Sequence, residues 1–125
     1  MKPFPVSVQL YSVRDHIKGA FPAMLKKIAA MGFAGVEFAG YHGHSPKELR
    51  RILDDLGLVA SSAHGPFPAP ENVAEVIDTA RTLGFTRHIA GCGPKEFETK
   101  EMTLRTAARA QAAADLLKGS GITFG

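Results

Sequence analysis

The sequence predicts an α/β fold with parallel strands, made of about four β-strand–α-helix units and the start of a fifth strand. Short β-rich runs alternate with amphipathic helical stretches, segments rich in Gly, His or Pro follow the runs, and a glycine precedes each later run. Units of this length favour parallel strands joined by right-handed crossovers, with helices covering the sheet.

The strand runs lie at residues 6–11, 34–38, 58–63 and 86–90, and a fifth run begins at Ile122. A glycine precedes each of the last four runs, and these glycines are Gly32, Gly57, Gly84 and Gly121. A glycine after a helix lets the chain turn back in a left-handed conformation that other residues adopt only at a cost. We therefore expect these glycines to separate the units.

The helices between the strands carry apolar residues at helical spacing. The expected core-facing sets are Phe21, Leu25, Ile28 and Met31 in the first helix, Leu49, Ile52, Leu53 and Leu56 in the second, and Val73, Val76, Ile77, Ala80 and Leu83 in the third. The second helix has the clearest start, because Ser45 and Glu48 form a Ser-x-x-Glu capping box around Pro46. An alanine-rich stretch within residues 99–118 predicts the fourth helix.

A barrel is favoured over an open nucleotide-binding sheet, because no G-x-G-x-x-G or G-x-x-x-x-G-K-[ST] motif follows any strand run. A (β/α)8 barrel takes about 250 residues, so four units in 125 residues correspond to half of one. We expect residues 1–125 to form a single domain, the N-terminal half of a TIM barrel truncated as its fifth strand begins. Self-association through the open strand edges is then expected.

Composition narrows the class of protein. The chain is 45% hydrophobic and 22% charged, which is typical of a globular domain. The single cysteine, Cys92, excludes an internal disulfide and a multi-thiolate zinc site, and it leads us to expect a cytoplasmic protein. No apolar run approaches the ~20 residues of a membrane span. The Lys and Arg residues behind the net charge of +3 are scattered, so we expect no nucleic-acid partner.

Five segments resemble the xylose-isomerase-like sugar phosphate isomerases and epimerases. They are VQLYSVRD (8–15), GFAGVEFAG (32–40), LDDLGL (53–58), SAH (62–64) and GITFG (121–125), in the order of that family. The resemblance implies a sugar or polyol derivative as substrate and a divalent metal ion (Mn, Mg, Co or Zn) in the full barrel. In that family the metal ligands lie mostly from the fifth strand onward, so we expect no metal site in this chain and no activity from the chain alone.

The functional residues of such barrels lie at the carboxyl ends of the strands and in the loops that follow. We predict catalytic roles for His64, which ends the third strand before Gly65, and for Glu37 in the second strand. An imidazole there can hydrogen-bond a substrate oxygen or transfer a proton near neutral pH. A carboxylate within a strand needs a partner, and the alternative for Glu37 is an internal ion pair with Arg14 or Arg87.

Four further residues are predicted to bind substrate: Gln9, Tyr11, His42 and Phe67. Gln9 alternates with apolar neighbours and points toward the barrel interior, although a purely structural amide is equally compatible with this pattern. Tyr11 and Phe67 would shield the site from water. His42 and His44 form an H-x-H pair in the second loop, which we interpret as a rim loop because no third ligand is near.

For the complete barrel we predict proton transfer next to a carbonyl, as in a sugar isomerase or epimerase. In this scheme a carboxylate removes a C–H proton, a divalent ion stabilises the enediolate, and a second group returns the proton. Two alternatives remain open. One is a non-catalytic half-barrel that associates with itself. The other is a DNA-repair barrel of the endonuclease IV type, which would need basic or aromatic loops after its strands.

Overall fold

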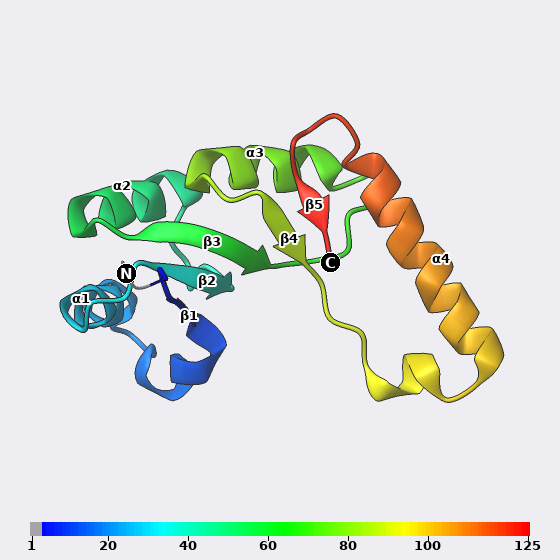
Figure 1. The fold of residues 1–125 in the computed structure, drawn as a ribbon, viewed down its shortest axis with the longest axis horizontal. Coiled ribbons are helices and arrows are strands. Elements are labelled where there is room, and N and C mark those ends of the chain that lie inside the picture. The colour runs from blue at the N-terminus through cyan, green and yellow to red at the C-terminus, as the bar shows by residue number, and fades with distance from the viewer. Residues whose placement is uncertain (1–3) are drawn as a thin grey trace.

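A computed structural model describes residues 4–125, and its helices and strands alternate as the sequence predicts (Figure 1). The elements are β1 (Ser7–Gln9), the 3-10 helix η1 (Leu10–His16), α1 (Phe21–Ala30), β2 (Gly35–Ala39), α2 (Pro46–Leu56), β3 (Val59–His64), α3 (Val73–Leu83), β4 (Arg87–Ile89), the 3-10 helix η2 (Pro94–Phe97), α4 (Lys100–Leu116) and β5 (Thr123–Phe124).

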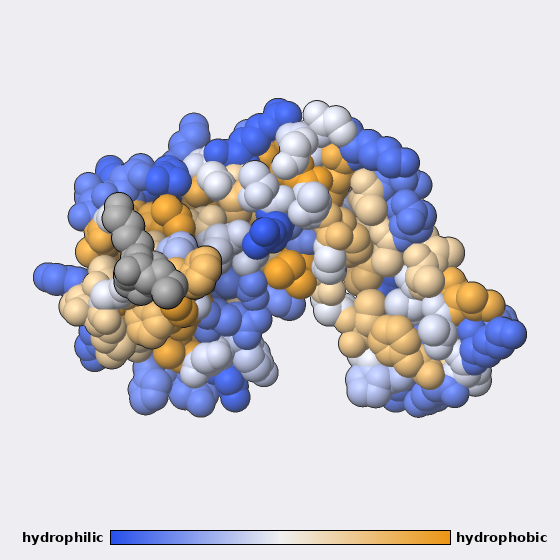
Figure 2. All heavy atoms as spheres, viewed as in Figure 1, coloured by the Kyte–Doolittle hydropathy of each residue, from blue (hydrophilic) through white to orange (hydrophobic). Residues whose placement is uncertain are grey.

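All neighbouring strands pair in parallel, in the order β1-β2-β3-β4-β5. Helices α2 and α3 lie along one face of this sheet, and within residues 4–125 no helix covers the opposite face (Figure 1). The molecule has the form of an arch in the space-filling view, hollowed between the segments at its two ends (Figure 2). The α/β fold with parallel strands is therefore confirmed.

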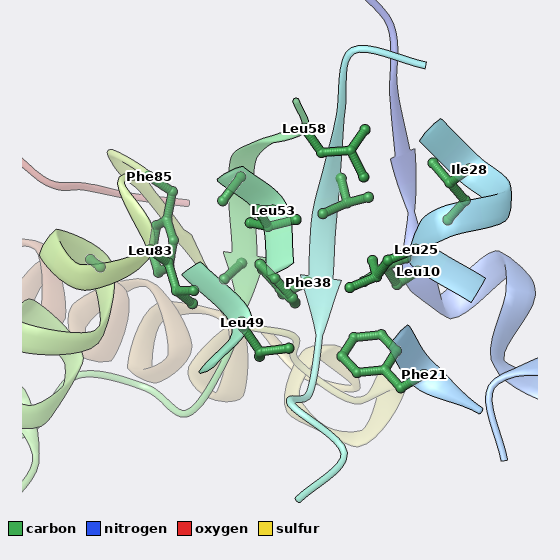
Figure 3. Close-up of a cluster of buried hydrophobic side chains, with 14 of the residues drawn as sticks. Leu10, Phe21, Leu25, Ile28, Phe38, Leu49, Leu53, Leu58, Leu83 and Phe85 are labelled. Atoms are coloured by element: carbon green, nitrogen blue, oxygen red, sulfur yellow. The ribbon is translucent and has the colours of Figure 1, made fainter. Parts of the chain in front are cut away.

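The core lies between the sheet and its helices (Figure 3). Val36 and Phe38 of β2 are fully buried there. The helices contribute fully buried leucines, which are Leu25 from α1, Leu49 and Leu53 from α2, and Leu83 from α3. Side chains alternate between the two faces of a strand, so Glu37 and Ala39 of β2 lie on the face opposite the helices. We call this the hollow face, because it borders the hollow of the arch. The burial of Val36 and Phe38 in the core thus determines that Glu37 faces the hollow.

The helix signals in the sequence are largely confirmed. Ser45 and Glu48 form the expected capping box, and the fourth helix lies within the expected stretch. Gly32, Gly57, Gly84 and Gly121 all have positive φ. Met31 was expected to face the core, but it is 70% exposed because α1 ends at Ala30.

The first strand is shorter than its sequence pattern predicts. It covers Ser7–Gln9 and not residues 6–11, because the chain turns into η1 at Leu10. Leu10 is fully buried, whereas Tyr11 is 58% exposed within η1. The prediction that Tyr11 ends the strand was wrong, although it still follows the carboxyl end of β1 directly.

Gly35 provides a test of the sheet packing. A Cβ at this position would lie 2.5 Å from the Val59 carbonyl oxygen and 2.9 Å from the Ser7 hydroxyl oxygen. We expect Gly35→Ala to lower the free energy of unfolding by about 1–3 kcal/mol, since backbone cannot move aside as a flexible side chain can. Gly91→Ala is the control, because a Cβ there meets nothing within 4 Å. Equal urea midpoints for both variants would contradict this packing.

The capping box makes stability depend on pH. Hydrogen bonds from the Ser45 backbone and hydroxyl to Glu48 lower the pKa of the Glu48 carboxyl. A carboxyl whose folded pKa is depressed contributes stability above its unfolded pKa and loses it as pH falls through the folded value. Glu48→Gln should therefore be less stable than the parent at neutral pH, with the difference shrinking in acid. Urea unfolding across this range measures it, and a pH-independent difference would contradict the assignment.

Candidate active site

Four polar side chains meet on the hollow face at the carboxyl ends of β1, β2 and β3. They are Gln9, Glu37, Ser62 and His64. Gln9 Nε2 donates to Glu37 Oε1 at 2.7 Å. The Ser62 hydroxyl donates to Glu37 Oε2. His64 Nε2 lies 3.5 Å from both Glu37 Oε1 and Gln9 Nε2. We call these four residues the polar cluster.

Strand register assembles the cluster. Gln9 pairs with Glu37, and Glu37 pairs with Ser62 across the parallel ladder, so the three share one face. The β2–β3 register shifts between Val36 and Glu37, which leaves Ser61 as an extra residue in β3. The Ser61 hydroxyl donates to the Val36 carbonyl at 3.1 Å. This bulge places Ser62 and His64, rather than Ser61, on the side of Glu37.

The surroundings of Glu37 resolve one of the alternatives left by the sequence. Within residues 4–125, neither Arg14 nor Arg87 pairs with Glu37, so the arginine ion pair was wrong. Arg14 instead donates to the Tyr11 carbonyl at 2.9 Å, and its guanidinium lies 4.2 Å from the centre of the Tyr11 ring. Glu37 accepts hydrogen bonds from two neutral side chains, Gln9 and Ser62. His64 is the neighbouring group that becomes positively charged when it is protonated.

The cluster can hold and transfer a proton. If His64 carries its proton on Nε2, that nitrogen points a donor toward Glu37; if Nδ1 carries it, Nε2 accepts from Gln9. The His64 side chain is 38% exposed and that of Glu37 only 18%. His64 is thus the member of the pair that a ligand reaches more easily.

A pocket of about 410 Å³ opens beside the cluster and is lined by Gln9, Tyr11, Ala39 and His64. Its volume is in the range of small-molecule sites. Three of the residues predicted to contact substrate therefore line one pocket. Glu37 lies directly behind them through its bond to Gln9.

His42 and Phe67 do not join this pocket. The His42 ring lies 4.7 Å from that of Phe21, and His42 lines a separate cavity with Lys18 and His44. Phe67 packs edge-on against Phe124, under the guanidinium of Arg109, and lines an apolar groove. The His42 ring thus packs on α1, and the Phe67 ring packs between β5 and α4. Their substrate contacts stay predictions that the pocket geometry does not support.

Sequence reasoning missed Ser62 as a site residue. Ser62 is 5% exposed, and its hydroxyl donates to Glu37. The available signal was its spacing, since Ser62 and His64 are two residues apart in one strand and so share a face.

The described part of this chain does not by itself supply a ligand set for a divalent metal ion. Residues 4–125 contain no group of three or more His, Cys, Asp or Glu side chains able to hold one. Both carboxylate oxygens of Glu37 already accept hydrogen bonds.

Across residues 4–125, no helix has the length and apolar character needed to cross a membrane.

Solved structures of similar fold match nearly all of this chain over about half of their own length. A sugar phosphate isomerase/epimerase from Parabacteroides distasonis matches 97% of this chain over 50% of its own length, with 20% identity and a TM-score of 0.70. An AP endonuclease of family 2 from Brucella melitensis matches 97% of this chain over 54% of its own length, with 20% identity and a TM-score of 0.73. A xylose isomerase-like TIM barrel protein from Mycobacterium smegmatis, in complex with magnesium, matches 97% of this chain over 54% of its own length. The identity is 19% and the TM-score 0.61.

These similarities confirm the expected fold, half of a TIM barrel. The chain spans about half the length of the structures it matches. No protein-family model and no curated protein sequence matches it.

Ser62→Ala tests the polar cluster. Removing the hydroxyl takes one donor from the Glu37 carboxylate, and we expect the free energy of unfolding to fall by about 1.5–3 kcal/mol, the range for hydrogen bonds to charged groups. Ser61→Ala is the matched control, because it removes a neutral bond to a carbonyl and should cost about 1 kcal/mol or less. Chemical denaturation of both variants measures the difference. A Ser61→Ala variant less stable than Ser62→Ala would contradict the assignment.

Proposed function

We propose that this chain forms the substrate-binding wall of a barrel that isomerises or epimerises a sugar or polyol derivative. The supporting observation is the polar cluster at the carboxyl ends of β1, β2 and β3, beside a pocket of about 410 Å³. Carbohydrate hydroxyls both donate and accept hydrogen bonds. Gln9 and His64 offer both functions at the pocket wall, and Tyr11 adds an exposed aromatic ring.

The reaction that suits such a cluster is proton transfer at a carbon next to a carbonyl. A base takes the C–H proton, and the electron pair moves toward the carbonyl oxygen. An acid then returns a proton to the neighbouring carbon, as in isomerisation, or to the opposite face of the same carbon, as in epimerisation. We assign His64 to a substrate oxygen, as the proton donor or acceptor. Glu37 holds the imidazole and balances its charge when it is protonated. Any divalent ion would be held by residues other than those of this chain, and the isolated chain is proposed to bind but not to turn over.

The experiment separates binding from turnover. Xylitol titrated into the labelled chain should move the His64 ring resonances, with a dissociation constant in the millimolar range. His64→Ala and Gln9→Ala should weaken binding by about tenfold, the equivalent of one hydrogen bond. His16→Ala, at an exposed position of η1, is the control.

Two results would contradict the proposal. One is the absence of any polyol- or sugar-dependent shift at His64. The other is exchange of ketose C–H hydrogen for solvent deuterium by the chain alone, which would show that the wall needs no further residues.

A DNA-repair function is the second candidate, favoured by the similarity to the AP endonuclease. Arginine–aromatic pairs also lie near the strand ends, with Arg14 over Tyr11 and Arg109 over Phe67. Such pairs suit stacking on nucleic-acid bases. Titration of a duplex that contains an abasic site should give salt-dependent binding if this candidate holds. Binding that is undetectable at low salt would exclude it.

Self-association is a separate proposal about the partner. Among the described residues, β1 and β5 are the outer strands of the sheet, and each pairs with one neighbouring strand. Open edges favour pairing with another chain, and we propose a second copy as the occupant. Sedimentation velocity across a range of protein concentrations should show a dimer. A monomer at all concentrations would contradict it.

A further inference from the structure

Buried His88 of β4 holds the turn that follows His64. His88 is 4% exposed, and its Nε2 lies 2.8 Å from the Pro66 carbonyl oxygen. Because a carbonyl oxygen only accepts, Nε2 carries the proton and donates. Nδ1 has no hydrogen-bond partner within residues 4–125. The bond to Pro66 is therefore the polar contact that defines the orientation of this imidazole.

Close packing fixes the same ring from two sides. A Cβ on Gly65 would lie 2.6 Å from His88 Cε1, so the turn approaches the ring as closely as only glycine allows. The Phe124 ring is stacked with the imidazole, at a centroid distance of 6.3 Å and an interplanar angle of 24°. The Gly65 backbone N–H also donates to the Ile89 carbonyl at 2.9 Å. Strand β4 thus forms hydrogen bonds to both Gly65 and Pro66, the two residues that follow His64.

We propose that His88 is the positioning residue for His64. His64 is joined directly to Gly65, and its Nε2 lies 3.5 Å from Glu37 Oε1, a distance that a small shift of the turn would change. His88 is in register with Ala63, on the face opposite His64, so it acts through the backbone without contacting the pocket. This inference rests on the proposed function only for the role of His64; the mechanical link is independent of it.

The test compares His88→Phe with His88→Gln in the full chain. Phe keeps an aromatic ring but removes the donor, whereas the Gln amide can place a donor near the position of Nε2. We expect His88→Phe to shift the His64 ring resonances, to speed hydrogen exchange of the Gly65 amide about tenfold, and to weaken xylitol binding by a similar factor. His88→Gln should restore all three to within about twofold of the parent.

The outcomes are distinguishable. Unchanged His64 resonances and Gly65 exchange in His88→Phe, or failure of His88→Gln to restore them, would overturn the proposal. If His88→Phe does not fold, Gly65→Ala tests the same link, because its Cβ pushes the turn off the ring. If the parent chain binds no polyol, the proposed function fails, but the resonance and exchange measurements still test the link.

Discussion

The alternation of side chains along β2 is the constraint on which the rest of the structure depends. Val36 and Phe38 are fully buried against helices, and this burial fixes which face of the sheet those helices cover. Glu37, between them, must then face the hollow. Because β1 and β3 pair with β2 in parallel register, Gln9 and Ser62 follow Glu37 to the same side. The burial of two apolar side chains of β2 thus places the polar cluster on the hollow face.

Local signals in the sequence predicted most of this fold. Apolar spacing located the helices, the Ser45–Glu48 pair marked the start of α2, and glycines with positive φ ended units. These features depend on a few neighbouring residues, so a single sequence contains them. The 3-10 helix after β1 was not predicted, because Leu10 and Tyr11 continue a β-like pattern in the sequence although the chain already turns at Leu10.

The candidate site was predictable in part for the same reason. Gln9, Tyr11 and His64 lie at strand ends, and strand ends in a parallel sheet converge. The contact between Ser62 and Glu37 was not predictable, because it depends on a bulge in β3 that the sequence does not signal. Loop residues were least predictable. His42 and Phe67 pack on aromatic rings that are distant in sequence, at Phe21 and Phe124, and no local pattern indicates which wall a loop side chain will meet.

The uncovered face of the sheet has a consequence for the electrostatics of Glu37 and His64. Water reaches both side chains, so their attraction is weakened by a medium of high dielectric constant. Any polypeptide that closes the hollow would displace that water. The same two groups, at an unchanged separation, would then attract each other more strongly. The strength of the Glu37–His64 interaction therefore depends on whether polypeptide encloses the hollow.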